Sequence, residues 1–257
     1  MIKSASFIYN TNKIEFYNLI YAISYFSRIS ALNYGYAPVS KQIEQEYRYN
    51  QHQIEMYNQV YDRLGRQLTS NQTLCEVSCG FGGGLNYIKE KIESEVIGID
   101  SSKAALKYCK NKFGINVIGC KAPALPLKSS SVDAVICVEA AHLYFGAKFC
   151  DELYRCLKPG GVIVITDDSK GDYDKQISTI KRVLSHSGFE ITECENIVHN
   201  VLLACELDHK RRMKYIFWSF GKLRSLLLGF FGCKGGKKFD KFQKGIHGYY
   251  MLRAIKH

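Results

Sequence analysis

The chain has 257 residues, of which 46% are hydrophobic and 23% are charged. These values exclude a wholly disordered chain, a collagen and a coiled coil, and they predict one large α/β domain with appendages or one domain and a half. Lysine and arginine outnumber the acids by 35 to 24, which gives a formal net charge of +11.

The basic excess is local. The segment His209–Gly245 holds eleven basic side chains against one acid, Asp240, and the rest of the chain is nearly neutral. A charge this localised indicates contact with an anionic surface or substrate and argues against a protein that coats nucleic acid. We therefore predict no nucleic-acid partner.

The ten cysteines indicate a reduced setting. They run from Cys75 to Cys233 without a Cys-x-x-Cys pair and without a secretory leader pattern before them. We expect a cytoplasmic protein with buried, inert thiols. Cys75 and Cys79 have a spacing that a metal site could use, but no second pair at zinc-ligand distance accompanies them, so no metal is predicted. No apolar run of about 18 residues is uninterrupted, which predicts no membrane span.

Turn and helix patterns fill the N-terminal part. Residues 1–40 are rich in Tyr, Asn and Ile and end in a turn containing Gly and Pro at Asn33–Pro38. From Lys41 to Leu68, apolar residues recur at helical intervals, which predicts one amphipathic helix or two. Residues 1–68 are therefore assigned to an N-terminal helical cap.

From Thr73 onward, short apolar runs alternate with helical stretches. This alternation predicts a parallel sheet with right-handed crossovers and helices on both faces. The predicted strands are Thr73–Val77, Val96–Ile99, Asn116–Ile118, Val132–Val138, Val162–Thr166, Glu190–Cys194 and Tyr249–Ile255. The predicted helices are Gly83–Ile92, Ser102–Phe113, Ala147–Leu157 and Lys175–His186. The core is assigned to residues 69–208 and 246–257, with a basic helical insertion at 209–245 before the last strand.

A candidate ligand site follows the first two strands. The first strand runs into Glu76–Gly84, where glycines let the backbone approach a ligand and a helix begins with free N–H groups. The second strand ends in Asp100, 18 residues after Gly82, where a Rossmann-type site uses a carboxylate to hold ribose hydroxyls. The pair indicates an adenosine-containing cofactor. The alternative is a tight turn with Asp100 as a cap of the helix that follows Ser101.

The glycine spacing argues against NAD. A dinucleotide site has glycine at the first, third and sixth positions, whereas Ser78, Gly80 and Gly82 occupy alternate positions here. An acid, Glu76, stands two residues before Ser78 and suits a cationic ligand such as a sulfonium with an amino-acid tail.

At this point the sequence resembles the class I S-adenosylmethionine-dependent methyltransferases, from about Asn33 to the C-terminus. The likeness continues through Ala124–Leu127, Val132–Val135 and Leu157–Gly161. Within that superfamily the chain is similar to small-molecule O-methyltransferases of the phthiotriolone and rifamycin type. That likeness rests on Glu76–Gly84, on Val138–Tyr144, and on Asn200–Leu202 leading to Glu206–Asp208. The resemblance implies a Rossmann-like, doubly wound seven-stranded sheet, mostly parallel with the last strand antiparallel.

The resemblance also implies roles for the cofactor-binding residues. Glu76, Gly80 and Gly82 would line the methionine end of S-adenosylmethionine, with Ser78 in place of the first glycine. Asp100 and Ser101 would face the ribose, and Ala122 and Ile99 would enclose the adenine. Tyr34 and Tyr36 would belong to a lid, and Glu139 would contact the cofactor; plain packing is the alternative for the two tyrosines. Lys121 departs from the family, which usually has Asp there to accept from the adenine amino group, and Lys cannot accept.

The methyl acceptor would meet Glu139 and His142, which follow the fourth strand. A hydroxyl acceptor must lose a proton, and His142 is the candidate base because an imidazole ordinarily titrates at about pH 6.5. Glu139 would orient His142 or take the proton itself. The alternative is that Glu139 only positions the cofactor and that His142 caps a turn, because proximity alone can drive methyl transfer.

The acceptor itself is expected to be small and lipophilic. Aromatic and aliphatic residues among the basic ones at 209–245 predict an acceptor-side cover that contacts an anionic membrane peripherally; a solvated basic face over ordinary core leucines is the alternative. N- or C-methylation of another small molecule and a catalytically impaired fold, for which Lys121 argues, stay open. Methylation of base or amide nitrogen is disfavoured, because Cys137–His142 lacks the Asn/Asp-Pro-Pro-aromatic motif.

Overall fold

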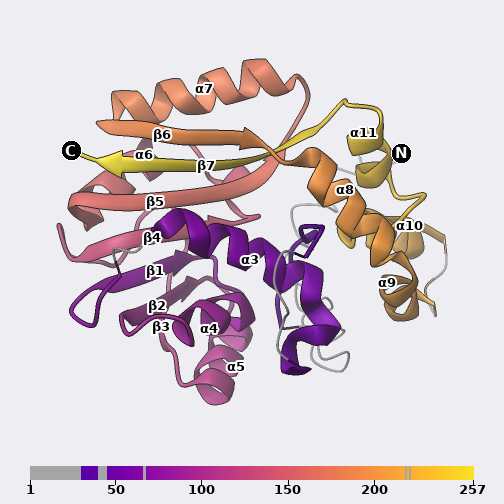
Figure 1. Ribbon diagram of the computed structural model, residues 1–257, viewed down its shortest axis with the longest axis horizontal. Helices are drawn as coiled ribbons and strands as arrows, with labels where there is room; N and C mark the ends of the chain where they lie inside the picture. The colour runs from indigo at the N-terminus through magenta and orange to yellow at the C-terminus, as the bar shows by residue number, and fades with distance from the viewer. Residues whose placement is uncertain (1–29, 40–44, 66–67, 218, 220) are drawn as a thin grey trace, which may run out of the picture.

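A computed structural model describes residues 30–39, 45–65, 68–217, 219 and 221–257. Its centre is one seven-stranded sheet in the order β3-β2-β1-β4-β5-β7-β6 (Figure 1). The strands are β1 Thr73–Val77, β2 Glu95–Asp100, β3 Asn116–Gly119, β4 Val132–Val138, β5 Leu157–Ser169, β6 Phe189–Asn196 and β7 Gly248–Lys256. The predicted fold class is confirmed.

The strand directions place the candidate site. Strands β1 to β5 pair in parallel, whereas β7 lies between β5 and β6 and is antiparallel to both. The order reverses at β1, which has β2 on one side and β4 on the other. In open sheets of this kind, ligands bind at the carboxyl ends of the strands beside such a reversal.

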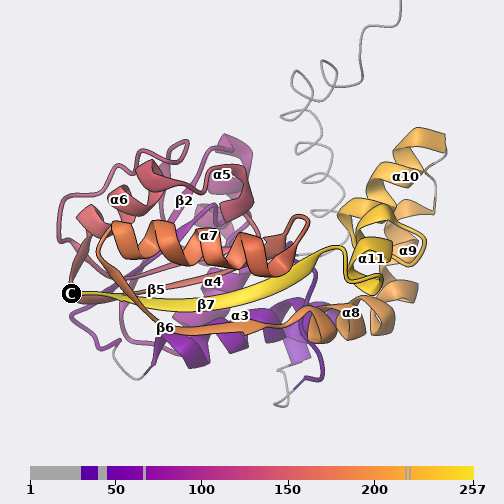
Figure 2. The ribbon, with the colours of Figure 1, turned by 90° about the horizontal axis from the view of Figure 1, so that it is seen from above.

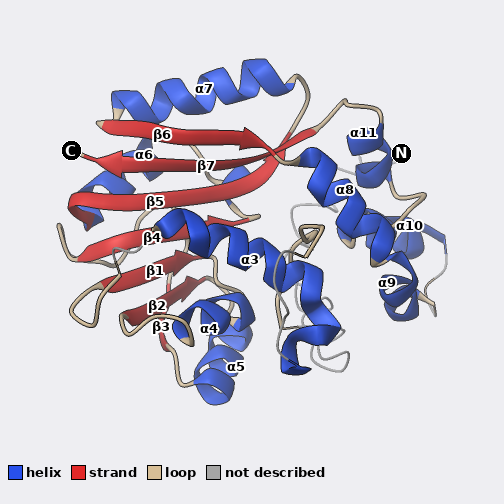
Figure 3. Ribbon diagram, in the orientation of Figure 1, coloured by secondary structure: helices blue, strands red, loops and turns tan. Residues whose placement is uncertain are grey.

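Helices cover both faces of the sheet (Figures 2 and 3). On one face, α3 Gln51–Leu64, α4 Gly83–Lys89 and α5 Lys103–Phe113 share a core cluster with Leu74 and Ile136. On the other face, α6 Ala147–Cys156 and α7 Tyr173–His186 share a second cluster with Cys75 and Val135. Neighbouring residues of β1 and β4 thus enter opposite clusters, as the period of a strand buried on both faces requires.

The N-terminal helix is shorter than predicted. A 3-10 helix, η1 Gln45–Asn50, leads into α3, which ends at Leu64 before Gly65 with φ 76°. A left-handed residue cannot continue a right-handed helix, so the pattern that extends to Leu68 does not decide where the helix ends. The predicted residues 1–29 and 40–44 lie outside the described part.

Strand β5 is longer than predicted at both ends. At its start, a bulge opposite β4 between Val132 and Ala134 keeps the Lys158–Gly161 turn residues within the strand. At its end, Asp167 to Ser169 pair with β7. The prediction ended the strand at Thr166 because the next residues are polar. In the structure these residues continue the strand, because β7 supplies partners for their backbone hydrogen bonds.

The segment between β6 and β7 is helical throughout most of its length. The helix α8 Val198–Leu207 was not predicted and precedes three helices of the basic insertion, α9 His209–Ile216, α10 Gly221–Phe230 and α11 Lys237–Gln243. These four helices lie beyond the carboxyl ends of β1 and β4 (Figures 1 and 2). The insertion therefore stands at the edge of the sheet where the candidate site lies.

Two sequence expectations concern the cysteines and the membrane. All ten cysteines are free, and eight of them are buried. Among the described residues, no helix has the length and apolar character that crossing a bilayer demands.

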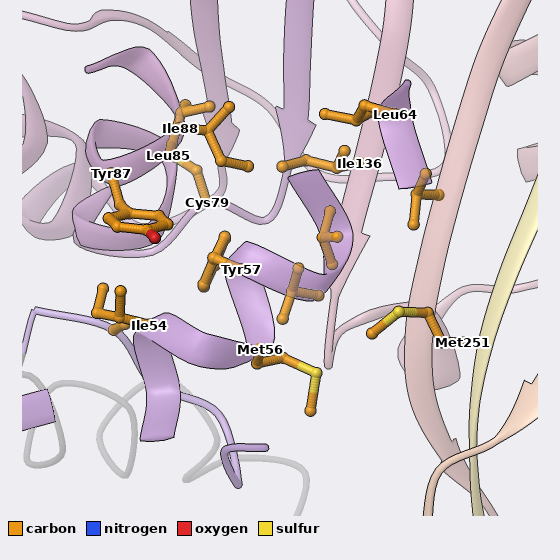
Figure 4. Packing of buried hydrophobic residues seen from close by; sticks show 14 of the residues in the cluster. Ile54, Met56, Tyr57, Leu64, Cys79, Leu85, Tyr87, Ile88, Ile136 and Met251 are labelled. Atoms are coloured by element: carbon orange, nitrogen blue, oxygen red, sulfur yellow. The ribbon is translucent and has the colours of Figure 1, made fainter. Parts of the chain in front are cut away.

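Helix α4 approaches α3 closely at a glycine. A Cβ on Gly84 would lie 2.0 Å from Cζ of Tyr57, whose side chain packs in the cluster with Leu85 and Ile88 (Figure 4). No L side chain fits at this distance without a shift of the tyrosine ring. This close contact with Tyr57 explains why the third residue of the run 82–84 is a glycine.

Replacing Gly84 by Ala is expected to lower the free energy of unfolding by roughly 1–3 kcal/mol, the cost of overpacking a tight core contact. Gly229→Ala is the matched control, because Gly229 is also helical and a Cβ there meets nothing within 4 Å. That control should be neutral or gain up to about 1 kcal/mol from helix propensity. Urea unfolding of both variants measures the difference, and equal stabilities would contradict the packing argument.

Candidate active site

The glycine turn after β1 is covered by the segment 30–39. Ser78 has φ 64° and Gly82 has φ 77°, both in the left-handed region. Ser78 accepts this conformation although glycine favours it, and its Oγ lies 3.0 Å from the Tyr144 hydroxyl. The N–H of Gly83, at the start of α4, donates to the Ser30 carbonyl at 3.1 Å. The N-terminal segment thus rests directly on the turn.

Asp100 ties the ends of β1 and β2 together. Its carboxylate is 8% exposed and accepts from the Gly80 N–H at 2.9 Å and from the Ser102 N–H at 2.8 Å. Burial raises the pKa of Asp100, and these backbone donors partly offset the rise. Asp100 therefore caps the helix that follows it and also holds the glycine turn. One carboxylate oxygen accepts from the start of α5, and the other accepts from the glycine turn.

Glu76 is a buried acid with an unused oxygen. Oε1 accepts from the Tyr57 hydroxyl at 2.7 Å, whereas Oε2 is buried without a hydrogen-bond partner among the described residues. Burial raises the pKa of Glu76 well above its ordinary value, and the Tyr57 hydroxyl offsets part of this rise. A buried acceptor without a donor is costly, so this oxygen fits a site that receives a donor or a cation from a ligand.

Glu139 stands where β4 ends, with φ 54°. Its Oε1 accepts from the Tyr34 N–H at 2.5 Å and from the Tyr249 hydroxyl at 2.5 Å. Burial raises the pKa of Glu139 to about 8, although both hydrogen bonds lower it. The carboxyl is therefore poised to change its charge near neutral pH.

His142 has an acid partner that the sequence reading did not assign. Its Nδ1 lies 2.9 Å from Oδ1 of Asp167, and its backbone N–H donates to Oδ2 of the same carboxylate at 2.7 Å. The His142 side chain is 22% exposed, whereas that of Asp167 is 1% exposed. A carboxylate on Nδ1 fixes the ring orientation and leaves Nε2 to act as a base.

A second acid, Asp168, lies beside this pair. It forms an ion pair with Lys238 of α11, and Nδ1 of His247 lies 3.7 Å from its Oδ2. Burial would raise the pKa of Asp168, but the Lys238 ammonium, helped by His142, lowers it below its ordinary value. Ligand atoms of His142, Asp167 and Asp168 lie within 4.8 Å of one another, a spacing that a metal ion could use. Lys238 already supplies a cation to Asp168, and the absence of a metal stays a prediction.

The insertion also holds Tyr34 in place. Arg212 of α9 is 2% exposed and donates to the Tyr34 carbonyl and the Phe231 carbonyl, each at 2.6 Å. Asp208 accepts from Arg212 at 2.9 Å and from Gln53 of α3 at 3.1 Å. A chain of hydrogen bonds therefore runs from Asp208 through Arg212 and Tyr34 to Glu139.

The remaining predicted residues lie at different depths. Tyr34 packs edge-on against Phe242 and Tyr249 at the site. The backbone N–H of Tyr36 donates to the His52 carbonyl, and burial and the nearby Glu195 raise the pKa of its hydroxyl. Ser101 and Lys121 are exposed, and Ala122 is partly buried beside the end of β3.

The sequence reading missed several residues that complete the site. Asp167 follows a predicted strand directly, so the rule that ligands meet carboxyl ends of parallel strands could have found it. Tyr249 begins the predicted last strand and Tyr57 lies on the predicted helix, but nothing local to either residue shows that it faces Glu139 or Glu76. Tyr144 ends the Val138–Tyr144 motif, and its hydroxyl is hydrogen-bonded to both Ser78 and Cys137.

Replacing Glu139 by Gln is expected to change how stability depends on pH. The folded-state pKa of Glu139 is raised to about 8 from 4.5. Its stabilising contribution is therefore fully present below pH 4.5 and is lost as pH rises towards 8, by at most about 1.4 kcal/mol per pH unit. The variant keeps an oxygen acceptor for Tyr34 and Tyr249 but cannot titrate.

Urea unfolding of both proteins from pH 5 to pH 8 tests this expectation. The stability of the wild type relative to the variant should fall as pH rises. A difference that stays constant across this range would show that Glu139 does not titrate there.

The chain matches known proteins over its central part. Residues 75–165 match the methyltransferase domain family. The chain is 32% identical to phthiotriol/phenolphthiotriol dimycocerosates methyltransferase 1 of Mycobacterium ulcerans over 54% of each chain. It is 29% identical to a fatty-acid O-methyltransferase of Mycolicibacterium smegmatis over 53% of this chain and 52% of that one. The chain thus spans about half the length of the curated relatives it matches.

Solved structures share the fold over nearly the whole chain. The cyclase SpnF has a TM-score of 0.73 at 17% identity and covers 94% of each chain. Geranyl diphosphate C-methyltransferase from Streptomyces coelicolor A3(2) has a TM-score of 0.68 at 15% identity and covers 91% of this chain and 93% of that one. Residues 75–165 thus match a methyltransferase domain, the sheet has the fold of the solved methyltransferase structures, and about half of the chain is related at about 30% identity to the phthiotriol dimycocerosate methyltransferases.

Proposed function

We propose that this protein transfers a methyl group from S-adenosylmethionine to a hydroxyl of a small lipophilic acceptor. The observation that carries the proposal is the meeting of two sites at one edge of the sheet. The glycine turn and Asp100 lie at the ends of β1 and β2, and the His142–Asp167 pair joins the ends of β4 and β5. A cofactor site and a base beside it are what O-methylation requires.

The residues present fit the cofactor. Glu76 offers a buried oxygen without a donor, which suits the cationic methionine end, and Asp100 retains acceptor capacity for ribose hydroxyls. When bound, S-adenosylmethionine supplies an electrophilic methyl group on a sulfonium. Because the segment 30–39 rests on the glycine turn, we propose that it moves when the cofactor enters and then covers it, as expected of a lid. Lys121 leaves recognition of the adenine to backbone groups near Ala122.

The side chains after β4 and β5 would handle the acceptor proton. Asp167 holds Nδ1 of His142, so Nε2 is the atom that takes the hydroxyl proton. Glu139 accepts from Tyr34 and Tyr249 and is better placed to hold the lid than to orient His142. This arrangement makes His142 the base and Glu139 a positioning residue.

The relatives and the basic insertion support a lipophilic acceptor. The names of two relatives specify a dimycocerosate lipid and a fatty acid as the compounds methylated. The basic segment between β6 and β7 lies at the same edge as the site, and we propose that it contacts an anionic membrane peripherally. A reduced, cytoplasmic location is also proposed, in line with ten unpaired thiols.

The first test concerns the cofactor. Asp100→Ala is expected to weaken S-adenosylmethionine binding by about 1–3 kcal/mol, since it removes a charged acceptor for ribose hydroxyls. Asp133→Ala is the matched control, because Asp133 also accepts a backbone N–H at 2.9 Å but lies at the start of β4, away from the site. Calorimetry should show an altered affinity for the first variant alone; equal affinities would remove Asp100 from the site.

The second test concerns the base and uses two acceptors, a long-chain diol and a long-chain fatty acid. Transfer to the diol needs a base, whereas the carboxylate is already deprotonated at neutral pH. His142→Ala should slow transfer to the diol by roughly 10²–10⁴-fold and change transfer to the fatty acid little. Asp167→Asn should slow the diol reaction in the same sense.

His186→Ala is the matched control, because His186 ends α7 and hydrogen-bonds Arg182 far from the site. Its rates should equal those of the wild type, measured with labelled cofactor. A His142→Ala variant that methylates the diol at the wild-type rate would remove the base role. A long-chain amine is assayed beside the two oxygen acceptors, and transfer to the amine alone would replace O-methylation by N-methylation.

A further inference from the structure

Exposed apolar side chains gather on the insertion. Seven large hydrophobic side chains of the described residues are exposed, and five of them lie between residues 207 and 246. These five are Leu207, Phe217, Leu223, Leu226 and Ile246. Single exposed apolar residues are ordinary, but five within one segment mark an interaction surface.

Their spacing places several of them beside lysines. In α9 and directly after it, Lys210, Lys214 and Phe217 are three or four residues apart, and all three are exposed. Residues at this spacing lie on one side of a helix. A shallow, open depression on this side is lined by Lys210, Met213, Lys214 and Phe217. In α10, Leu223 and Leu226 are each 43% exposed, next to the exposed Lys222.

The charge of this surface has one sign. Helices α9 and α10 contain basic residues and no acid. Arg212 is buried and paired with Asp208, but Lys210, Lys214 and Lys222 form no ion pair within the part of the chain that the structure describes. Cores of protein–protein interfaces are depleted in lysine, whereas lysines flanking exposed aromatic and leucine side chains are typical of proteins that lie on anionic membranes.

The surface adjoins the candidate site. Lys238 of α11 pairs with Asp168, and Phe242 of the same helix packs against Tyr34. The Tyr34 hydroxyl donates to the Gly229 carbonyl of α10 at 3.4 Å. Helices α9 and α10, which carry the exposed residues, therefore contact Tyr34, and the neighbouring helix α11 contacts Asp168. The three helices lie together at this end of the molecule (Figure 2).

We propose that Lys210, Lys214, Phe217, Lys222, Leu223 and Leu226 form a docking surface for the anionic leaflet of a lipid bilayer. The lysines meet lipid phosphates, and the apolar side chains enter the interface between them. This inference rests on the proposed function, because docking places the site beside the membrane in which a lipophilic acceptor dissolves. The proposal gives Lys210, Lys214 and Lys222, which contribute to the excess positive charge of the insertion, a role in binding lipid phosphates.

Co-sedimentation of the full chain with vesicles tests the surface. Vesicles of phosphatidylcholine alone and of phosphatidylcholine with phosphatidylglycerol are compared at low salt. The wild type should bind the anionic vesicles and should be released by salt. The triple variant Lys210→Gln, Lys214→Gln, Lys222→Gln should lower the partition coefficient about 100-fold, from about 1 kcal/mol per lysine. The double variant Leu223→Gln, Leu226→Gln should also weaken binding.

The matched control removes the same charge elsewhere. Lys103, Lys107 and Lys110 are exposed on α5, and their triple replacement by Gln should leave vesicle binding within a few-fold of the wild type. Equal losses in the two triple variants would overturn the surface in favour of general electrostatic attraction. Equal binding to neutral and anionic vesicles, or no binding at low salt, would overturn it as well.

Methyl transfer separates failure of docking from failure of the proposed function. The α9–α10 lysine variant should methylate a detergent-dispersed long-chain diol at the wild-type rate and the same diol in anionic vesicles more slowly. Equal rates on vesicles would contradict a role for docking in delivery. Vesicle binding by a wild type that methylates neither form would support the surface and contradict the O-methyltransferase proposal instead.

Discussion

The burial of carboxylates at one edge of the sheet constrains the rest of this structure. Glu76, Asp100, Asp167 and Asp168 are each at most 8% exposed, and a buried carboxylate without partners costs several kcal/mol. Their partners come from four separate parts of the chain. Tyr57 of α3 donates a hydrogen bond to Glu76, and the glycine turn donates one to Asp100. His142 is hydrogen-bonded to Asp167, and Lys238 of α11 forms an ion pair with Asp168. Oε2 of Glu76 is buried and has no hydrogen-bond partner within the described part of the chain.

This requirement explains why the insertion and the N-terminal segment are parts of the site rather than additions to it. Lys238 neutralises Asp168, and Arg212 fixes the Tyr34 carbonyl while the Tyr34 N–H holds Glu139. Removing the insertion would take the Lys238 ammonium away from Asp168 and the Arg212 guanidinium away from the Tyr34 carbonyl. The chemistry at the ends of β4 and β5 therefore depends on residues that lie far from them in the sequence.

The fold itself does not decide the reaction. A cyclase and a C-methyltransferase share this architecture over more than nine-tenths of the chain, at identities too low to carry more than the fold. The reaction is decided by the side chains at the edge of the sheet, which here include the His142–Asp167 pair beside the proposed cofactor site. The helices α9 and α10 add a basic and apolar surface next to that edge.

Local patterns in the sequence determined the strands, most helices, the glycine turn and Asp100, because period, glycine spacing and the position of an acid after a strand are short-range signals. The antiparallel last strand and the cofactor came from the resemblance. Only the tertiary structure decided which groups meet, since His142 and Asp167 are 25 residues apart, Tyr34 and Glu139 are 105 apart, and Tyr34 and Arg212 are 178 apart. The extension of β5 into Asp167 and Asp168 and the pKa of Glu139 also belong to this second class. Pairing with β7 extends β5, and burial raises the pKa of Glu139. Both effects depend on residues distant in the sequence, so the local sequence does not show them.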